Sequence, residues 1–105
     1  MLSLIAELYG IEKLVKGKPP DYRAQMRKTR AGPILAELEK QLQTTLLRVP
    51  QKMPLAKAIH YALTRWKALL LYLDDGTVEI DNNPIEREIR PIDLGRKNYL
   101  FARSD

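Results

Sequence analysis

Residues 55–73 read LAKAIHYALTRWKALLLYL, and this stretch has the strongest helical periodicity in the chain. Its apolar positions follow one another at steps of three and four residues: Leu55, Ile59, Ala62, Trp66, Leu69 and Leu73. Because an α-helix turns once in about 3.6 residues, this spacing collects them on one face. We therefore predict a single amphipathic helix here, and a fold built by packing such helices against one another.

The N-terminal half carries the same kind of pattern twice. Apolar residues recur with helical spacing over residues 4–15 and again over residues 34–46. The segment Gly17–Pro20 should end the first helix, because proline has no amide hydrogen to donate and glycine tolerates the turn. A second helical stretch should begin near Asp21, and Gly32–Pro33 should break or kink it.

The C-terminal part predicts one more helix and contains the strand candidates. A helix that starts around Asn83–Pro84 would carry its isoleucines on one face. Residues 77–80 alternate like a short strand, and residues 98–101 could form a second one. We predict a mainly α fold, a helical bundle-like array of about four helices with at most a short two-stranded β element near the C-terminus. Residues 1–105 should form a single helical unit.

The composition is that of an ordinary globular chain and excludes several kinds of site. Hydrophobic residues make up 45% and charged residues 30% of the 105 residues. There is no cysteine, which excludes disulfides, thiolate metal sites and cysteine nucleophiles. The longest apolar run, Ala68–Leu73, is far shorter than a membrane span, and no basic leader precedes the acid at Glu7. We expect a soluble, cytoplasmic protein.

Positive charge is concentrated in one segment. Between Ile11 and Arg30 lie seven cations and two acids, so this basic segment accounts for the whole net charge of +5. Its candidates for nucleic-acid binding are Lys16, Lys18, Arg23, Arg27, Lys28 and Arg30. A dense basic segment suits contacts to phosphates, which supply much of the affinity for nucleic acid. A solvated basic surface without a specific partner is the alternative interpretation.

Residues 81–90 read DNNPIEREIR and place a carboxylate among guanidinium groups. If Pro84 opens a helix, Glu86 lies in its first turn and Arg90 lies one turn further along the same face. Such a group could bind a metal ion together with a phosphate backbone. The same residues also suit a helix cap, with Asn83 as the N-cap and Glu86 paired with Arg90 across one turn. Both interpretations stay open, because a cap also fixes where the carboxylate points.

The C-terminal sequence resembles the closing signature of a known transposase family. The residues that carry the resemblance are DNNPIER at 81–87, IRP at 89–91 and GRKNYLFA at 95–102. Upstream, LYGIE at 8–12 and AIHY at 58–61 are similar as well. The family is that of the insertion-sequence 66 transposases, which are DDE-type enzymes, and the resemblance covers nearly the whole chain.

The resemblance implies a function for this segment. In the family, a ribonuclease H-like catalytic domain holds two metal ions on three carboxylates, and Glu86 matches the third, a ligand of the metal. This implies DNA transposition by metal-dependent phosphoryl transfer, with Mg²⁺ expected in the intact enzyme. The cations that it suggests for phosphate contacts are Arg87, Arg90, Arg96 and Lys97. The implied partners are DNA at the transposon ends and, as a further option, other copies of the chain, without membrane contact.

The chain departs from the family pattern in two respects. It has no room for the sheet that carries the other two carboxylates, and Asp74, Asp75 and Asp81 lie in a predicted turn and helix start instead. Arg103 stands where the family pattern leads us to expect a glycine. We therefore expect a C-terminal fragment of a transposase that lacks most of the catalytic sheet, binds no metal alone and is inactive alone. A non-catalytic helical module for DNA binding or protein interaction is the alternative.

Overall fold

The computed structural model describes the backbone of residues 1–73 and 84–103 and the side chains of residues 1–73 and 87–98. Its helices are α1 (Leu2–Val15), α2 (Pro20–Met26), η1 (Arg27–Ala31), α3 (Gly32–Arg48), α4 (Pro54–Thr64), α5 (Trp66–Tyr72) and α6 (Pro84–Arg103). The part of the chain so described contains no strand. The prediction of a mainly α fold is confirmed.

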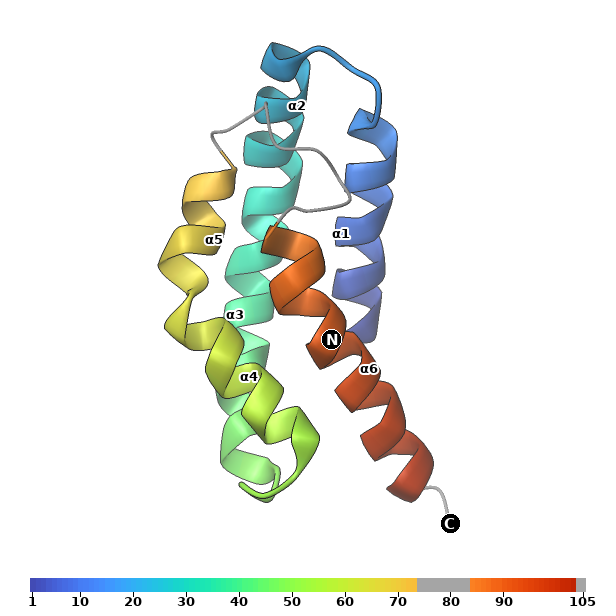
Figure 1. Cartoon of the computed structure of the whole chain (residues 1–105), viewed down its shortest axis with the longest axis vertical. Coiled ribbons are helices and arrows are strands. Elements are labelled where there is room, and N and C mark those ends of the chain that lie inside the picture. Colours follow the sequence, from blue (N-terminus) through green and yellow to red (C-terminus); the bar gives the residue numbers. More distant parts are fainter. Residues whose placement is uncertain (74–83, 104–105) are drawn as a thin grey trace.

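The N-terminal helices form an antiparallel hairpin (Figure 1). α1 runs in one direction, and α2, η1 and α3 return beside it as one column. The turn between the two arms contains Gly17, whose φ of 78° is reached without strain only when there is no Cβ. Pro20 opens α2, where its missing amide is not needed. The inner faces of the two arms, including Leu8 of α1 and Leu38 of α3, meet in the core.

A widened turn lies where we predicted that Gly32–Pro33 would break or kink the helix. Pro33 has no amide hydrogen, so it cannot donate to the carbonyl of Thr29, as another residue in an α-helix would. η1 is a π-helical turn, in which the amide of Gly32 donates to the carbonyl of Arg27, five residues earlier. This turn absorbs the interruption, and α3 continues in the direction of α2 (Figure 1). The helix is distorted here but not broken.

The stretch predicted as one helix over residues 55–73 is divided into α4 and α5. At Arg65 the backbone has φ −108° and ψ 9°, and its amide donates to the carbonyl of Ala62, only three residues earlier, at 3.1 Å. All six periodic apolar residues are nevertheless buried. The predicted face is therefore confirmed, whereas the prediction of one continuous helix is wrong. A one-residue interruption changes the helix direction while the apolar side chains keep facing the core.

The last helix, α6, packs across the bundle and contacts α1, α4 and α5. It begins at Pro84, where the sequence predicted a helix start. Ile89 and Ile92 are fully buried on its inner face, in agreement with the predicted isoleucine face. Gly95 allows a close crossing with α4, because a Cβ added there would lie 3.2 Å from the Cα of Leu55. This crossing fixes α6 against the rest of the molecule.

The predicted β element is not found where it can be checked. Residues 98–101 belong to α6, so the strand predicted there is wrong. Gly95 lies inside α6 at the close contact with Leu55 of α4, and the helix continues past it to Arg103. The other predicted strand, residues 77–80, lies outside the described residues. None of the described helices is long and apolar enough to cross a membrane.

Candidate functional site

The residue predicted as the catalytic carboxylate belongs to the start of α6. Because this helix begins at Pro84, Glu86 lies in its first turn, as the sequence predicted. The helix dipole favours a negative group there by about 0.3–1 kcal/mol. The side chain of Glu86 lies outside the described side chains. The predicted cap residue, Asn83, lies outside the described residues altogether. The catalytic role and the capping role therefore both stay predictions.

Three of the cations predicted to bind DNA share one face of α6. Arg87, Arg90 and Lys97 are exposed, and the helical spacing places them opposite the buried Ile89 and Ile92. Steps of three and seven residues keep the three cations within a narrow sector of the helix surface. We call these three residues the α6 stripe. Within the described part of α6, the α6 stripe brings three of the predicted site residues together on one exposed face.

Neighbouring side chains hold two members of the α6 stripe. The guanidinium carbon of Arg90 lies 5.3 Å from the ring centre of Tyr9 on α1, within the range of a cation–π contact. Nζ of Lys97 lies 3.2 Å from Oδ2 of Asp93, while the Lys97 side chain keeps 59% of its surface exposed. Such contacts reduce the conformational entropy that these side chains would lose on meeting a phosphate.

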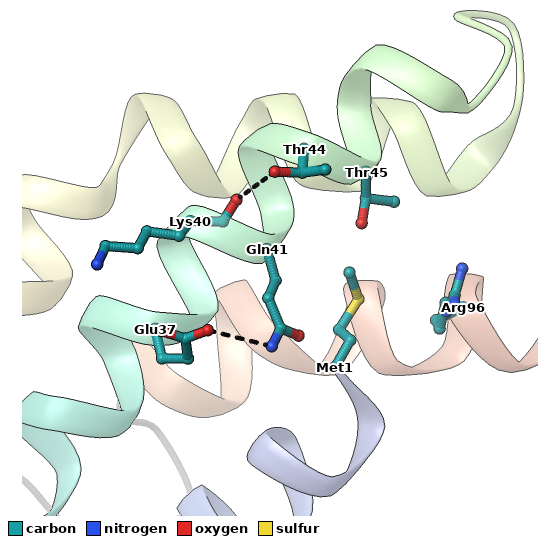
Figure 2. A pocket seen from close by; sticks show the side chains of 7 residues that line it. All are labelled: Met1, Glu37, Lys40, Gln41, Thr44, Thr45 and Arg96. Atoms are coloured by element: carbon teal, nitrogen blue, oxygen red, sulfur yellow. Dashed lines mark hydrogen bonds between the residues drawn. The ribbon is translucent and has the colours of Figure 1, made fainter.

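Arg96, the fourth predicted cation of this helix, lies apart from the α6 stripe. It is partly buried and lines a pocket of about 280 Å³ together with Met1 and residues of α3 (Figure 2). On the α3 side, the carboxamide nitrogen of Gln41 donates to Glu37 at 3.4 Å, and Thr45 also borders the pocket. A phosphate contact by Arg96 would therefore involve a different surface from that of the α6 stripe.

The basic segment is divided into an exposed set and a buried pair. The exposed members are Lys13, Lys16, Lys18, Lys28 and Arg30. Arg23 is only 6% exposed and Arg27 is not exposed at all. These two arginines are four residues apart, so they lie on the same side of the helical column. Contact between DNA and Arg27 would require the helices to separate.

A buried cluster with Glu12 and Tyr72 holds the guanidinium of Arg27. Nε and Nη2 of Arg27 donate to the two carboxylate oxygens of Glu12, each at 3.1 Å. The hydroxyl of Tyr72 donates to the same carboxylate, and the ring centre of Tyr72 lies 4.3 Å from the guanidinium carbon. Burial, and after it the bond to Glu12, raises the pKa of Tyr72 above its ordinary range. This Glu12 cluster ties α1, η1 and α5 together.

The sequence interpretation missed the Glu12 cluster and two buried acids of α6. A signal for Glu12 was present, because it lies four residues after Leu8 and three before Val15, on the buried face of α1. Glu88 and Asp93 are 4% and 5% exposed. Oε2 of Glu88 is buried and has no hydrogen-bond partner in the part of the chain that the structure describes. The spacing of α6 carried a similar signal, because Glu88 lies four residues before Ile92 and Asp93 lies four residues after Ile89.

The described residues do not form a metal site by themselves. No group of three or more His, Cys, Asp or Glu side chains converges among them. A catalytic site with two divalent ions draws on several carboxylates, so Glu86 would need further ligands from outside the described residues. We therefore assign no chemical step through a metal ion to this part of the chain.

Comparisons with known proteins match the whole chain. The model of a family described as "Transposase IS66 family" matches residues 1–105. "Uncharacterized protein y4qI" of Sinorhizobium fredii is 45% identical over 105 residues, which cover 98% of this chain and 20% of the relative. "Uncharacterized protein y4jD" of the same organism is 37% identical over 102 residues, which cover 97% of this chain and 20% of the relative. The chain thus spans about a fifth of the length of these relatives, and no solved structure matches it significantly.

Proposed function

Because this chain belongs to the IS66 family of transposases, we propose that it forms the C-terminal part of an enzyme of DNA transposition. The reaction would be metal-dependent phosphoryl transfer on DNA, with Mg²⁺ as the metal of the intact enzyme. Glu86 would supply one of its metal-binding carboxylates, and the α6 stripe would contact DNA phosphates. The chain alone would bind DNA without catalysing strand transfer.

The arrangement of α6 is the observation that carries this proposal. The helix buries its isoleucine face and presents three exposed cations, and Glu86 lies in the turn where these cations begin. Arginine suits phosphate binding, because its planar guanidinium can donate two hydrogen bonds to one phosphate group. Since Arg87 follows Glu86 directly and Arg90 lies one turn further on, DNA held by these arginines would pass close to the carboxylate.

The exposed cations of the basic segment would assist DNA binding in a less specific way. Lys16, Lys18 and Lys28 add positive charge that attracts any polyanion over roughly a Debye length, which is about 8 Å at physiological salt. Arg27 does not contribute a contact in this proposal, because it is buried against Glu12. The proposal therefore gives the α6 stripe the direct phosphate contacts.

A salt-dependent DNA titration of the chain tests the binding part of this proposal. The test variant is Arg87→Gln/Arg90→Gln/Lys97→Gln, and the control variant Lys52→Gln/Lys57→Gln/Lys67→Gln removes the same charge from exposed positions elsewhere. Loss of three phosphate contacts should reduce the slope of log Kd against log salt by about 2–3 and weaken binding by about tenfold or more at low salt. Fluorescence anisotropy with a short duplex measures both quantities. Equal effects of the two variants would mean that the attraction is not specific to α6.

The catalytic part needs a full-length relative. There, replacing the glutamate that aligns with Glu86 by glutamine should lower strand transfer by about a hundredfold or more, because removal of a group that stabilises transition-state charge has effects of that order. DNA binding by the same variant should stay within a few-fold of the unaltered protein. Full strand-transfer activity would show that the catalytic assignment is wrong. The alternative, a non-catalytic helical module for DNA or protein binding, would then be favoured.

A further inference from the structure

The stretch from Lys40 of α3 to Leu73, just after α5, contains no aspartate or glutamate. It carries a set of exposed cations, none of which forms an ion pair with another residue that the structure describes. These cations are Lys40, Arg48, Lys52, Lys57, Arg65 and Lys67. Because no acid of the same stretch offsets their charge, this part of the molecule should attract polyanions.

Part of this charge lies on the outer face of α4, beside an exposed aromatic ring. The inner face of α4, which includes Leu55, Ile59 and Ala62, is buried in the core. The helical spacing therefore places Lys57 and Tyr61 on the opposite side of the helix. Tyr61 keeps 50% of its surface exposed, although an aromatic side chain gains free energy when it is covered.

The guanidinium of Arg65 lies over the ring of Tyr61. Its central carbon is 4.3 Å from the ring centre, within the range of a cation–π contact. Both residues are exposed, and Arg65 stands at the interruption between α4 and α5. The contact restrains the two side chains before any ligand arrives, so less conformational entropy is lost on binding. We call Tyr61 and Arg65 the α4 platform.

We propose that the α4 platform binds an unpaired nucleotide of single-stranded DNA by stacking against its base. Unpaired bases stack on aromatic side chains and on arginine, while nearby cations attract the phosphates. Lys57, one turn before Tyr61 on the same face, is placed to attract a neighbouring phosphate. Bases inside a duplex are covered by their neighbours on both sides, so stacking of this kind selects unpaired strands.

The α4 platform adds a second surface to the α6 stripe, and the inference rests on the proposed DNA function. α4 and α6 are neighbours, since Gly95 of α6 crosses close to Leu55 of α4. In this account the α6 stripe contacts phosphates of a duplex, and the α4 platform holds a base that has left one. DNA whose strands separate near the α6 stripe would therefore meet a binding surface for the unpaired strand on the neighbouring helix.

A comparison of two single strands tests the stacking directly. Oligothymidine and an abasic oligomer of the same length carry the same phosphates, but only the first has bases. The unaltered chain should bind oligothymidine about tenfold more tightly, because one stacked base contributes a factor of that order. Tyr61→Leu should bind the two strands equally. Fluorescence anisotropy at low salt measures each Kd.

Two results of this comparison would overturn the proposal. Equal binding of both strands by the unaltered chain would mean that the surface attracts any polyanion, an acidic protein included. No binding of oligothymidine at all would exclude a single-stranded ligand.

Two further variants keep the net charge of the platform and separate stacking from electrostatic attraction. Arg65→Lys retains the charge but loses the planar guanidinium, so it should weaken oligothymidine binding severalfold. The slope of log Kd against log salt should not change, because no cation is removed. Tyr61→Phe retains the ring and should bind like the unaltered chain. A loss as large as that of Tyr61→Leu would contradict a stacking role for the ring.

Tyr22 provides the matched control. It is 43% exposed on α2, and its ring centre lies 5.9 Å from Nζ of Lys18, so it too has a cation beside it but no guanidinium. Tyr22→Leu should keep the preference for oligothymidine over the abasic strand. Loss of the preference in this variant as well would show that the α4 platform is not the specific site. Circular dichroism of every variant confirms that it is folded before its affinity is compared.

A duplex probe distinguishes failure of this inference from failure of the proposed function. Tyr61→Leu should bind the duplex like the unaltered chain, whereas the α6 stripe variant should bind it weakly and still prefer oligothymidine to the abasic strand. If the α6 stripe variant binds the duplex normally, the proposed function loses its DNA contact while the platform stands. If Tyr61→Leu keeps the full preference for oligothymidine, the platform alone is wrong.

Discussion

The hairpin of α1–α3 and the helix α6 both carry many cations, yet they place them differently. In the hairpin, Arg27 turns inward and meets a buried carboxylate and a buried phenol. In α6, Arg87 and Lys97 stay in solvent, because the opposite face of that helix is occupied by buried isoleucines. The number of charges in a segment therefore does not identify a binding surface. The position of each charge on its helix, and what lies opposite it, does so.

Removing the arginine of the Glu12 cluster should have the largest effect on stability. Arg27→Met would leave the carboxylate of Glu12 buried without its cation, and we expect the free energy of unfolding to fall by about 3–5 kcal/mol. Arg30→Met, three residues further along and exposed, should change it by less than about 0.5 kcal/mol. Urea denaturation followed by circular dichroism measures both. Equal losses would show that burial does not distinguish the two arginines.

The crossing of α6 over α4 should respond to a side chain at Gly95. Gly95→Gln would push atoms against the backbone of Leu55, and we expect the free energy of unfolding to fall by about 1–3 kcal/mol. Gly10→Gln on α1 is the matched change, because the space around it is open, and its better helix propensity should add up to about 1 kcal/mol. Urea denaturation at low protein concentration compares the two variants. A gain from both would mean that α6 does not approach α4 closely.

The phenol of the Glu12 cluster adds a dependence on alkaline pH. The pKa of Tyr72 is raised in the folded chain, so its stabilising effect is complete below the ordinary pKa of 10.0 and is lost as the pH rises beyond it. Tyr72→Phe should lower the free energy of unfolding by about 1 kcal/mol at neutral pH, through loss of the hydrogen bond to Glu12. As the pH is raised into the alkaline range, the free energies of unfolding of the unaltered chain and of Tyr72→Phe should converge. A growing difference would contradict the raised pKa.

Replacing each of the two buried glutamates by glutamine should change the free energy of unfolding in opposite directions. The effect at Glu88 should be the smallest of those predicted. Glu12 accepts hydrogen bonds from Arg27 and Tyr72, whereas Oε2 of Glu88 has no hydrogen-bond partner among the described residues. Glu88→Gln replaces a buried charge by a neutral group of similar shape and should raise the free energy of unfolding by up to about 1 kcal/mol. Glu12→Gln should lower it. Thermal denaturation compares the pair, and a loss of stability on Glu88→Gln would reveal an unrecognised favourable contact of that carboxylate.

Features that depend on neighbours in sequence could be predicted, and they were predicted well. The spacing from Leu55 to Leu73 correctly identified a buried face, because burial follows from helical periodicity alone. The start of α6 at Pro84 followed from the preference of proline for the first turn of a helix. The interruption at Arg65 could not be predicted, because no glycine or proline marks it and packing against other helices decides the bend.

Features that depend on residues far apart in sequence were missed. Arg27 lies 15 residues from Glu12, and Glu12 lies 60 residues from Tyr72, so no local pattern joins the three. Because of this cluster, Arg27 is buried, although the sequence placed it among the candidates for DNA binding. The strand predicted at residues 98–101 was wrong as well, because Gly95 contacts Leu55 of the distant helix α4 from within α6, which continues to Arg103.

The most direct test of the difference between the two regions is to map where DNA contacts the chain. Amide chemical shifts of the isotope-labelled chain, recorded by NMR while a short duplex is added, report contacts residue by residue. We predict the largest changes around Arg87, Arg90 and Lys97, with little change at Arg27. Changes confined to the basic segment, with α6 unaffected, would contradict the assignment of DNA binding to the α6 stripe.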